Sequence, residues 1–122
     1  MDCVAIYKSL AEESRLRILN LLRKGPLCVC HVQEALEMPQ SKVSKQLSYL
    51  KKHGLLASRR YNNWTIYEIC AGDNSLVAAN LRELEKVFES GQYREDSSRL
   101  EKLDTSVACL PREESCCEGG AC

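Results

Sequence analysis

The sequence has no long hydrophobic run and few histidines. No apolar stretch reaches the ~18 residues of a membrane-spanning helix, and the N-terminus lacks the basic start and apolar segment of a signal peptide. We therefore expect a cytoplasmic protein with no membrane partner. The two histidines, His31 and His53, form no base–nucleophile pair, and the sequence has no evident catalytic triad, phosphate loop or paired-carboxylate motif. These absences argue against an enzyme.

Acidic residues are missing from the middle of the chain. The formal net charge is zero, yet the sequence has no Asp or Glu between Met38 and Tyr67, while acids outnumber bases from Gln92 onward. A basic patch of this kind is typical of a phosphate-binding surface; the alternative is a solvated charged face. The basic residues of the patch are Lys42, Lys45, Lys51, Lys52, Arg59 and Arg60.

Hydrophobic periodicity predicts a mainly α fold with one β-hairpin, an α+β winged helix-turn-helix. Asn62 lies in the expected hairpin turn and tolerates a positive φ. The alternative is a small α+β domain that binds no nucleic acid. The predicted helices are 4–10, 13–23, 28–36, 41–52 and 73–90, with residues 94–104 also compatible with a helix, and the predicted strands are 55–60 and 64–69.

The segment 41–52 has the features of a DNA-recognition helix. Val43, Leu47 and Leu50 share one face, and polar or basic residues occupy the other. Such a helix docks on a core and presents hydrogen-bonding groups to the major groove, while the hairpin contacts the DNA backbone or the minor groove. The predicted DNA-binding residues are Gln40, Ser41, Lys42, Ser44, Lys45, Tyr49, Arg59, Arg60 and Asn62.

The last long helix carries an apolar stripe at helical spacing, formed by Val77, Leu81, Leu84 and Phe88. Because the preceding helices and the hairpin already form a hydrophobic core, we expect this stripe to pack against a partner subunit or the first helix. A homodimer would place two recognition helices ~34 Å apart on an imperfectly palindromic double-stranded DNA operator. The predicted organisation is a DNA-binding and dimerisation domain over residues 1–90 and a cysteine-containing tail over residues 91–122.

Several motifs in this order resemble the ArsR/SmtB family of metal-responsive repressors: Ser14-Arg15-Leu16-Arg17-Ile18-Leu19, Leu27-Cys28-Val29-Cys30, Gln40-Ser41-Lys42-Val43-Ser44-Lys45-Gln46-Leu47, Gly54-Leu55-Leu56 and Trp64-Thr65-Ile66-Tyr67. The resemblance covers about residues 4–90. It implies a homodimer that occupies its operator without inducer and leaves when inducer binds. In this family the Leu-Cys-Val-Cys segment marks sensors of arsenite, antimonite, cadmium or lead.

The sequence departs from the family pattern at three positions. His31 stands where the arsenite-type signature has Asp, Gln33 occupies the place of a frequent third cysteine, and Pro39 replaces a common Ser. The third ligand of a three-sulfur site is therefore open. The family's other sensor site, on the last helix, lacks both imidazoles, which argues against zinc sensing there; its matching positions are Asp73, Ser75, Lys86 and Glu89.

Cys28 and Cys30 are the first candidate ligands. Trivalent arsenic is soft and takes a pyramid of three thiolates. On an ideal helix the two side chains point about 200° apart, so one ion would bridge them only by unwinding the first turn of the predicted helix 28–36. We expect this distortion to weaken DNA binding. The alternative is a pair of ordinary half-buried cysteines.

The tail supplies the second candidate site, Cys116, Cys117 and Cys122, in a Cys-Cys-x4-Cys pattern closed by flexible glycines. Methylated arsenic needs only two thiolates, which Cys116 and Cys117 could provide. The alternative is a redox-buffering or incidental tail. We favour Cys28 and Cys30 as required for release, with the third sulfur from the tail or from Cys3; Cys109 is a weaker candidate, and Cys70 is interpreted as structural.

The sequence thus predicts a transcriptional repressor released from its operator by trivalent arsenic or antimony on cysteine thiolates. Arsenite and antimonite are the expected inducers, with methylarsenite, cadmium or lead as alternatives. A second hypothesis is a thiol-redox-responsive regulator on the same winged-helix body. Tight arsenite binding under fully reducing conditions would separate the two.

Overall fold

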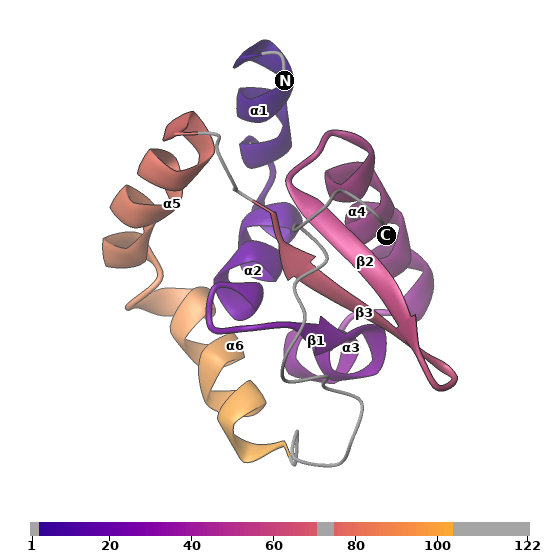
Figure 1. Cartoon of the computed structure of the whole chain (residues 1–122). Coiled ribbons are helices and arrows are strands. Elements are labelled where there is room, and N and C mark those ends of the chain that lie inside the picture. Colours follow the sequence, from indigo (N-terminus) through magenta and orange to yellow (C-terminus); the bar gives the residue numbers. More distant parts are fainter. Residues whose placement is uncertain (1–2, 71–74, 104–122) are drawn as a thin grey trace.

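The computed structural model describes residues 3–70 and 75–103. It contains six helices and a small antiparallel sheet in these ranges (Figure 1). The helices are α1 (Cys3–Leu10), α2 (Glu13–Leu22), α3 (Val29–Leu36), α4 (Gln40–Lys52), α5 (Ser75–Val87) and α6 (Gly91–Lys102). The strands are β1 (Leu27–Cys28), β2 (Leu56–Tyr61) and β3 (Trp64–Ile69), in the order β1-β3-β2.

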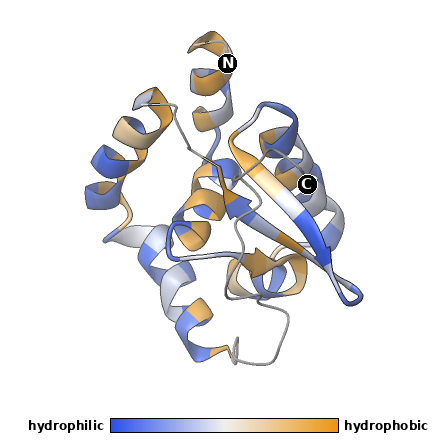
Figure 2. Ribbon diagram, viewed as in Figure 1, coloured by the Kyte–Doolittle hydropathy of each residue, from blue (hydrophilic) through white to orange (hydrophobic). Residues whose placement is uncertain are grey.

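The central helix is α2, and α1, α3, α4, α6 and β3 all pack against it. Its fully buried Ile18 and Leu19 meet the apolar face of α4, where Val43, Leu47 and Leu50 are also fully buried. The predicted inward face of α4 is therefore confirmed. Hydrophobic residues gather in α2 and at the start of β2, whereas the free end of the β2–β3 hairpin is hydrophilic (Figure 2).

Local signals explain where several elements end. Gly54 has a positive φ of 84° and closes α4, where the Leu55 N–H donates to the carbonyl of Leu50 at 3.0 Å. Asn62 has a φ of 55° in the two-residue hairpin turn, as expected for an asparagine. Glu37 takes the same left-handed conformation after α3, with a φ of 54°. The turn between α3 and α4 completes a helix-turn-helix, and the hairpin is its wing.

Helix α6 lies in the segment that the sequence analysis assigned to the tail, and it covers most of the residues 94–104 that were expected to be compatible with a helix. It packs against α2 and α3 through a buried ionic cluster. Fully buried Asp96 accepts two hydrogen bonds from Arg17, both 2.8 Å, and one from Arg99 at 2.8 Å. Arg99 also donates to the carbonyl of Ala35 and Arg17 to that of Leu36, so the cluster holds the end of α3.

The apolar side chains that were expected to form one stripe on a long helix pack against two different parts of the protein. Val77 is buried in the main core, whereas Phe88 is buried with its ring 5.1 Å from that of Tyr93. Leu81 packs against the main core. The predicted helix 73–90 is shorter in the structure, because α5 ends at Val87 and α6 begins at Gly91 with a positive φ.

None of the helices in the described ranges has the length and apolar character to cross a bilayer.

Candidate functional site

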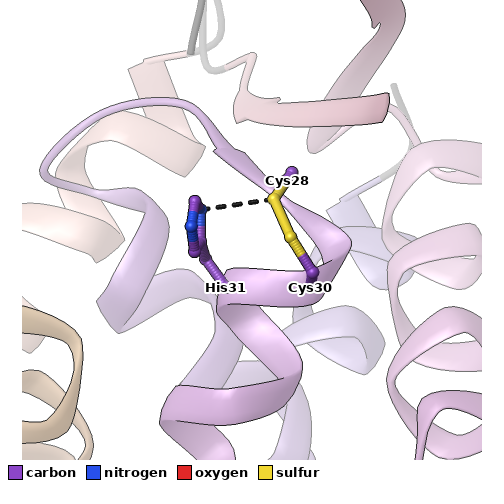
Figure 3. Close-up of side chains that lie close together, drawn as sticks. All are labelled: Cys28, Cys30 and His31. Atoms are coloured by element: carbon purple, nitrogen blue, oxygen red, sulfur yellow. Dashed lines mark hydrogen bonds between the residues drawn. A yellow bond between two sulfur atoms is a disulfide. The ribbon is translucent and has the colours of Figure 1, made fainter. Parts of the chain in front are cut away.

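The two cysteines of the Leu-Cys-Val-Cys segment lie at the start of α3 (Figure 3). Cys28 is in β1 and has extended backbone angles, φ −82° and ψ 159°, while Cys30 is the second residue of the helix. Their Cα atoms are 5.4 Å apart, and the two sulfur atoms form a disulfide. The pair is therefore already adjacent in the folded chain.

This geometry corrects one prediction from the sequence. A helix from residue 28 would have pointed Cys28 and Cys30 to nearly opposite faces, and bridging them would have required unwinding. The helix instead begins at Val29, and the extended conformation of Cys28 turns its side chain toward that of Cys30. A ligand can bridge the two sulfurs without unwinding α3, so the proposed helix distortion has no geometric basis.

His31 supplies a third donor atom beside the pair. Its Nδ1 lies 3.2 Å from Sγ of Cys28; a disulfide sulfur carries no proton, so the imidazole N–H is the donor. The ligand atoms of Cys28, Cys30 and His31 all lie within 4.8 Å of one another. Two thiolates and an imidazole suit soft and borderline ions, but only two of the three thiolates preferred by trivalent arsenic come from this group.

A short strand that the sequence did not reveal connects the cysteine pair to the wing. In β1, Cys28 is paired with Ile66 of β3, and Ile66 is paired with Arg59 of β2. Cys28 and Ile66 are almost completely buried against each other, with Cys30 packed beside them. The cysteines therefore border the same sheet that carries the basic hairpin. With two residues, β1 is too short to give a sequence pattern.

Most of the predicted DNA-binding residues are exposed in the structure. Those on α4 are Gln40, Ser41, Lys42 and Lys45, which are exposed, and Ser44, which is half-buried. On the hairpin, Arg60 and Asn62 are exposed and Arg59 is half-buried. Tyr49 differs, because it is half-buried and its ring centroid lies 4.1 Å from the guanidinium of Arg15 and 4.5 Å from the ring of His53.

Arg15 is a residue whose role sequence reasoning missed. Its guanidinium donates to the carbonyls of Lys8 and Ser9 at the end of α1, at 2.9 and 2.8 Å. It also donates to the side-chain oxygen of Gln46 on α4, at 2.9 Å. Arg15 thus joins α1, α2 and α4. An arginine in an amphipathic helix has no distinguishing sequence signal, so only the tertiary structure reveals this link.

The remaining candidate ligands are not brought to the α3 site within the described residues. Cys3 is free and exposed in α1, and in Figure 1 α1 lies above α2 whereas α3 lies below it. Cys70 follows β3 and is half-buried. The tail cysteines, Cys109, Cys116, Cys117 and Cys122, lie outside the described residues.

Comparison with known proteins shows similarity to bacterial regulators. Residues 12–58 match the family model described as "Bacterial regulatory protein, arsR family". The arsenic resistance transcriptional regulator ArsR2 of Pseudomonas putida is 31% identical over 116 residues, covering 92% of this chain and 95% of the relative. The regulator ArsR1 of the same organism is 40% identical over 65 residues, which cover 52% of this chain and about half, 51%, of the relative.

A solved structure shares the same architecture. The homodimeric winged helix-turn-helix DNA-binding domain Mb0332 of Mycobacterium bovis, described as a possible ArsR-family regulator, is 32% identical with a TM-score of 0.59. The match covers 70% of this chain and 81% of that domain. Together with the near full-length match to ArsR2 and the winged helix-turn-helix seen here, this shows that the chain belongs to the ArsR family of bacterial regulatory proteins.

Proposed function

We propose that this protein is a DNA-binding transcriptional repressor that leaves its operator when a trivalent arsenic or antimony species binds Cys28 and Cys30. The observation that carries the proposal is the adjacency of these two sulfurs at the start of α3, directly before the recognition helix α4. Support comes from relatives named as arsenic resistance regulators. Methylarsenite, cadmium and lead are alternative inducers for the same donors, and the expected location is the cytoplasm.

The proposed DNA contacts come from α4 and the hairpin. Exposed Lys42, Lys45 and Arg60 provide positive charge. Neither α4 nor β2 carries a carboxylate that would repel phosphates, and Glu68 of β3 is paired with Ala57, away from the hairpin turn. Side chains of the first α4 turn, such as Ser41, would reach base edges in the major groove.

We further propose that two copies bind an imperfect palindrome. Support comes from apolar side chains left outside the core: Val4 and Tyr7 on α1 are 56% and 47% exposed, and Val87 on α5 is 49% exposed. A second copy of this chain is the proposed occupant of this surface. Support also comes from the homodimeric state given for the Mycobacterium bovis domain.

The third ligand on arsenic is proposed to be a tail thiolate, from Cys116, Cys117 or Cys122, or the imidazole of His31. An operator duplex is first identified by selection from random sequences and is then labelled with a fluorophore. The test follows release of this duplex from the protein during titration with arsenite under reducing conditions. We expect Cys28→Ser to lose release and the Cys116→Ser/Cys117→Ser double variant to keep at least part of it. If only the tail variant loses the response, the sensing site is in the tail.

The Cys28–Cys30 disulfide favours one second candidate function, thiol-redox regulation. A dithiol reductant would supply two electrons and two protons to convert the disulfide to two thiols, becoming a disulfide itself. Operator affinity of the oxidised and reduced protein, measured without metal or metalloid, tests this function. Equal affinities would exclude it and leave the repressor controlled by metalloid binding.

A further inference from the structure

A pocket of about 390 Å³ opens beside the cysteine pair, between the start of α3, the start of α4 and the wing. We call it the groove. Its walls carry amides and hydroxyls from all three elements, and none of its lining residues is charged. The lining residues that matter here are Cys30, Gln33, Gln40, Ser44, Asn63 and Trp64.

We propose that the groove takes a phosphodiester strand of the operator and that a ligand on Cys28 and Cys30 fills the same groove. Release would then occur by direct exclusion of DNA, without distortion of α3. The proposal rests on the function proposed above, because it needs both an operator and a thiol ligand. The new element is that the operator and the thiol ligand compete for the same surface.

The chemistry of the groove fits a DNA backbone. Two walls of the groove carry side-chain hydrogen-bond donors, from Gln40 and Ser44 on α4 and from Asn63 on the wing. Such groups commonly bind phosphate and sugar oxygens. The groove lies between the elements that carry exposed Lys42 and Arg60. The α4 N-terminus beside it has no side-chain cap, so its positive dipole end adds to the attraction for phosphate.

The position of the sulfurs directs any ligand into this groove. Both cysteines line the groove; Cys28 is fully buried against Ile66, whereas Cys30 is half-buried. When arsenite reacts with the dithiol, two S–As bonds form and two As–O bonds break. Each leaving hydroxide takes a thiol proton and departs as water, with no change in oxidation state. The remaining substituent on arsenic would then occupy the groove that both sulfurs line.

The first test measures how DNA affects thiol reactivity. The reduced full-length protein is alkylated with iodoacetamide, alone and with saturating operator duplex, and each cysteine is followed by peptide mass spectrometry. We expect the operator to slow alkylation of Cys30 by about tenfold or more, because a bound strand covers its sulfur. Free, exposed Cys3 on α1 is the internal control and should keep its rate.

If Cys30 reacts equally fast in a complex verified by gel shift, the shared groove is wrong although the repressor function stands. If no operator complex forms under any condition, both the proposed function and the shared groove are wrong.

The second test fills the groove without touching a thiol. Gln33→Trp adds bulk inside it, and Glu34→Trp adds the same bulk at the next, exposed position of α3, which is not among the residues that line the groove. With no ligand present, we expect Gln33→Trp to weaken operator binding by about tenfold, equivalent to ~1.4 kcal/mol, and Glu34→Trp to leave it nearly unchanged.

Gln33→Glu provides a variant of native size, and its charge should also weaken binding by repelling phosphate. Ser98→Asp, at an exposed position of α6, is the charge control. Operator binding at the native level by folded Gln33→Trp and Gln33→Glu proteins would overturn the inference. Circular dichroism checks folding of each variant.

Discussion

Cys28 shows how one residue's backbone conformation decides what a motif can do. The spacing Cys-x-Cys on a helix separates the side chains, whereas a strand residue followed by a helix brings them together. In this protein Pro26 precedes β1, and Cys28 keeps the extended conformation up to the first turn of α3. The pair can therefore bind one ligand or form a disulfide on the same backbone.

Arg60 is the wing residue best placed to test DNA contact, because it is exposed near the hydrophilic end of the hairpin. Arg60→Ala should weaken binding to all duplexes and reduce the slope of log K against log salt by ~1, since one phosphate contact is lost. Fluorescence anisotropy at several salt concentrations measures this slope. Lys24→Ala is a matched control outside α4 and the wing, and an unchanged slope for Arg60→Ala would show that the wing does not touch DNA.

Asp96 is the residue on which the α6 attachment depends. Its carboxylate is fully buried and ion-paired with Arg17, and this hydrogen-bonded pair raises the pKa of Arg17 above its usual value. Asp96→Asn should lower the free energy of unfolding by ~3 kcal/mol, because it leaves two guanidinium groups without their carboxylate.

Urea denaturation measures this change. Glu95→Gln, at the exposed neighbouring position, should change stability by less than ~0.5 kcal/mol. A similar loss for both variants would mean that general helix effects, and not the buried ion pair, explain the result.

Among the elements, α6 connects the cysteine helix to the rest of the fold. Arg99 of α6 donates to Ala35 at 2.7 Å, and Asn20 of α2 donates to the Tyr93 carbonyl at 2.9 Å. The Arg99 bond holds the far end of α3 and the Asn20 bond holds α6 on α2, so a segment that the sequence assigned to the tail supports the helix that carries Cys30.

Two truncations test this dependence. A chain ending at Leu103 keeps α6 and should retain its melting temperature within a few degrees. A chain ending at Ser90 loses Asp96, Leu100 and the Phe88–Tyr93 contact, and should melt about 15 °C lower or more, because the Asp96 ion pair alone contributes ~3 kcal/mol and each kcal/mol corresponds to roughly 4–8 °C in a domain of this size. Differential scanning calorimetry measures both. Equal melting temperatures would show that α6 contributes little to stability.

At the scale of the whole molecule, the proposed dimer would decide how its two DNA-binding surfaces are presented. Leu84 on α5 is half-buried and is absent from the main core, unlike Leu81. Leu84→Asp should convert a dimer to monomers at micromolar concentration, because burying an unpaired carboxylate in an interface costs several kcal/mol.

Analytical ultracentrifugation distinguishes the two states. Lys86→Asp is the control on the same helix, at a side chain that is 82% exposed. If the Leu84→Asp protein stays dimeric, Leu84 lies outside the interface.

The sequence by itself determined the elements whose patterns are local. Apolar spacing in α2 and α4, Gly54 after α4 and Asn62 in the hairpin turn are signals read within a few residues, and each was correct in kind. The basic, acid-free middle of the chain predicted basic side chains on α4 and the wing, and most of these side chains are exposed. Element ends were less certain, as the shorter α5 shows, because end residues are held by contacts from elsewhere.

Only the tertiary structure decided features that depend on residues distant in the chain. Strand β1 exists because β3 pairs with it, and this pairing keeps Cys28 extended beside Cys30. The sequence of α6 is mostly polar. Asp96 is nevertheless buried, because Arg17, which lies 79 residues earlier in the chain, forms an ion pair with its carboxylate. No local pattern encodes such partners. The chemistry of the cysteines could therefore be predicted from sequence, but their geometry could not.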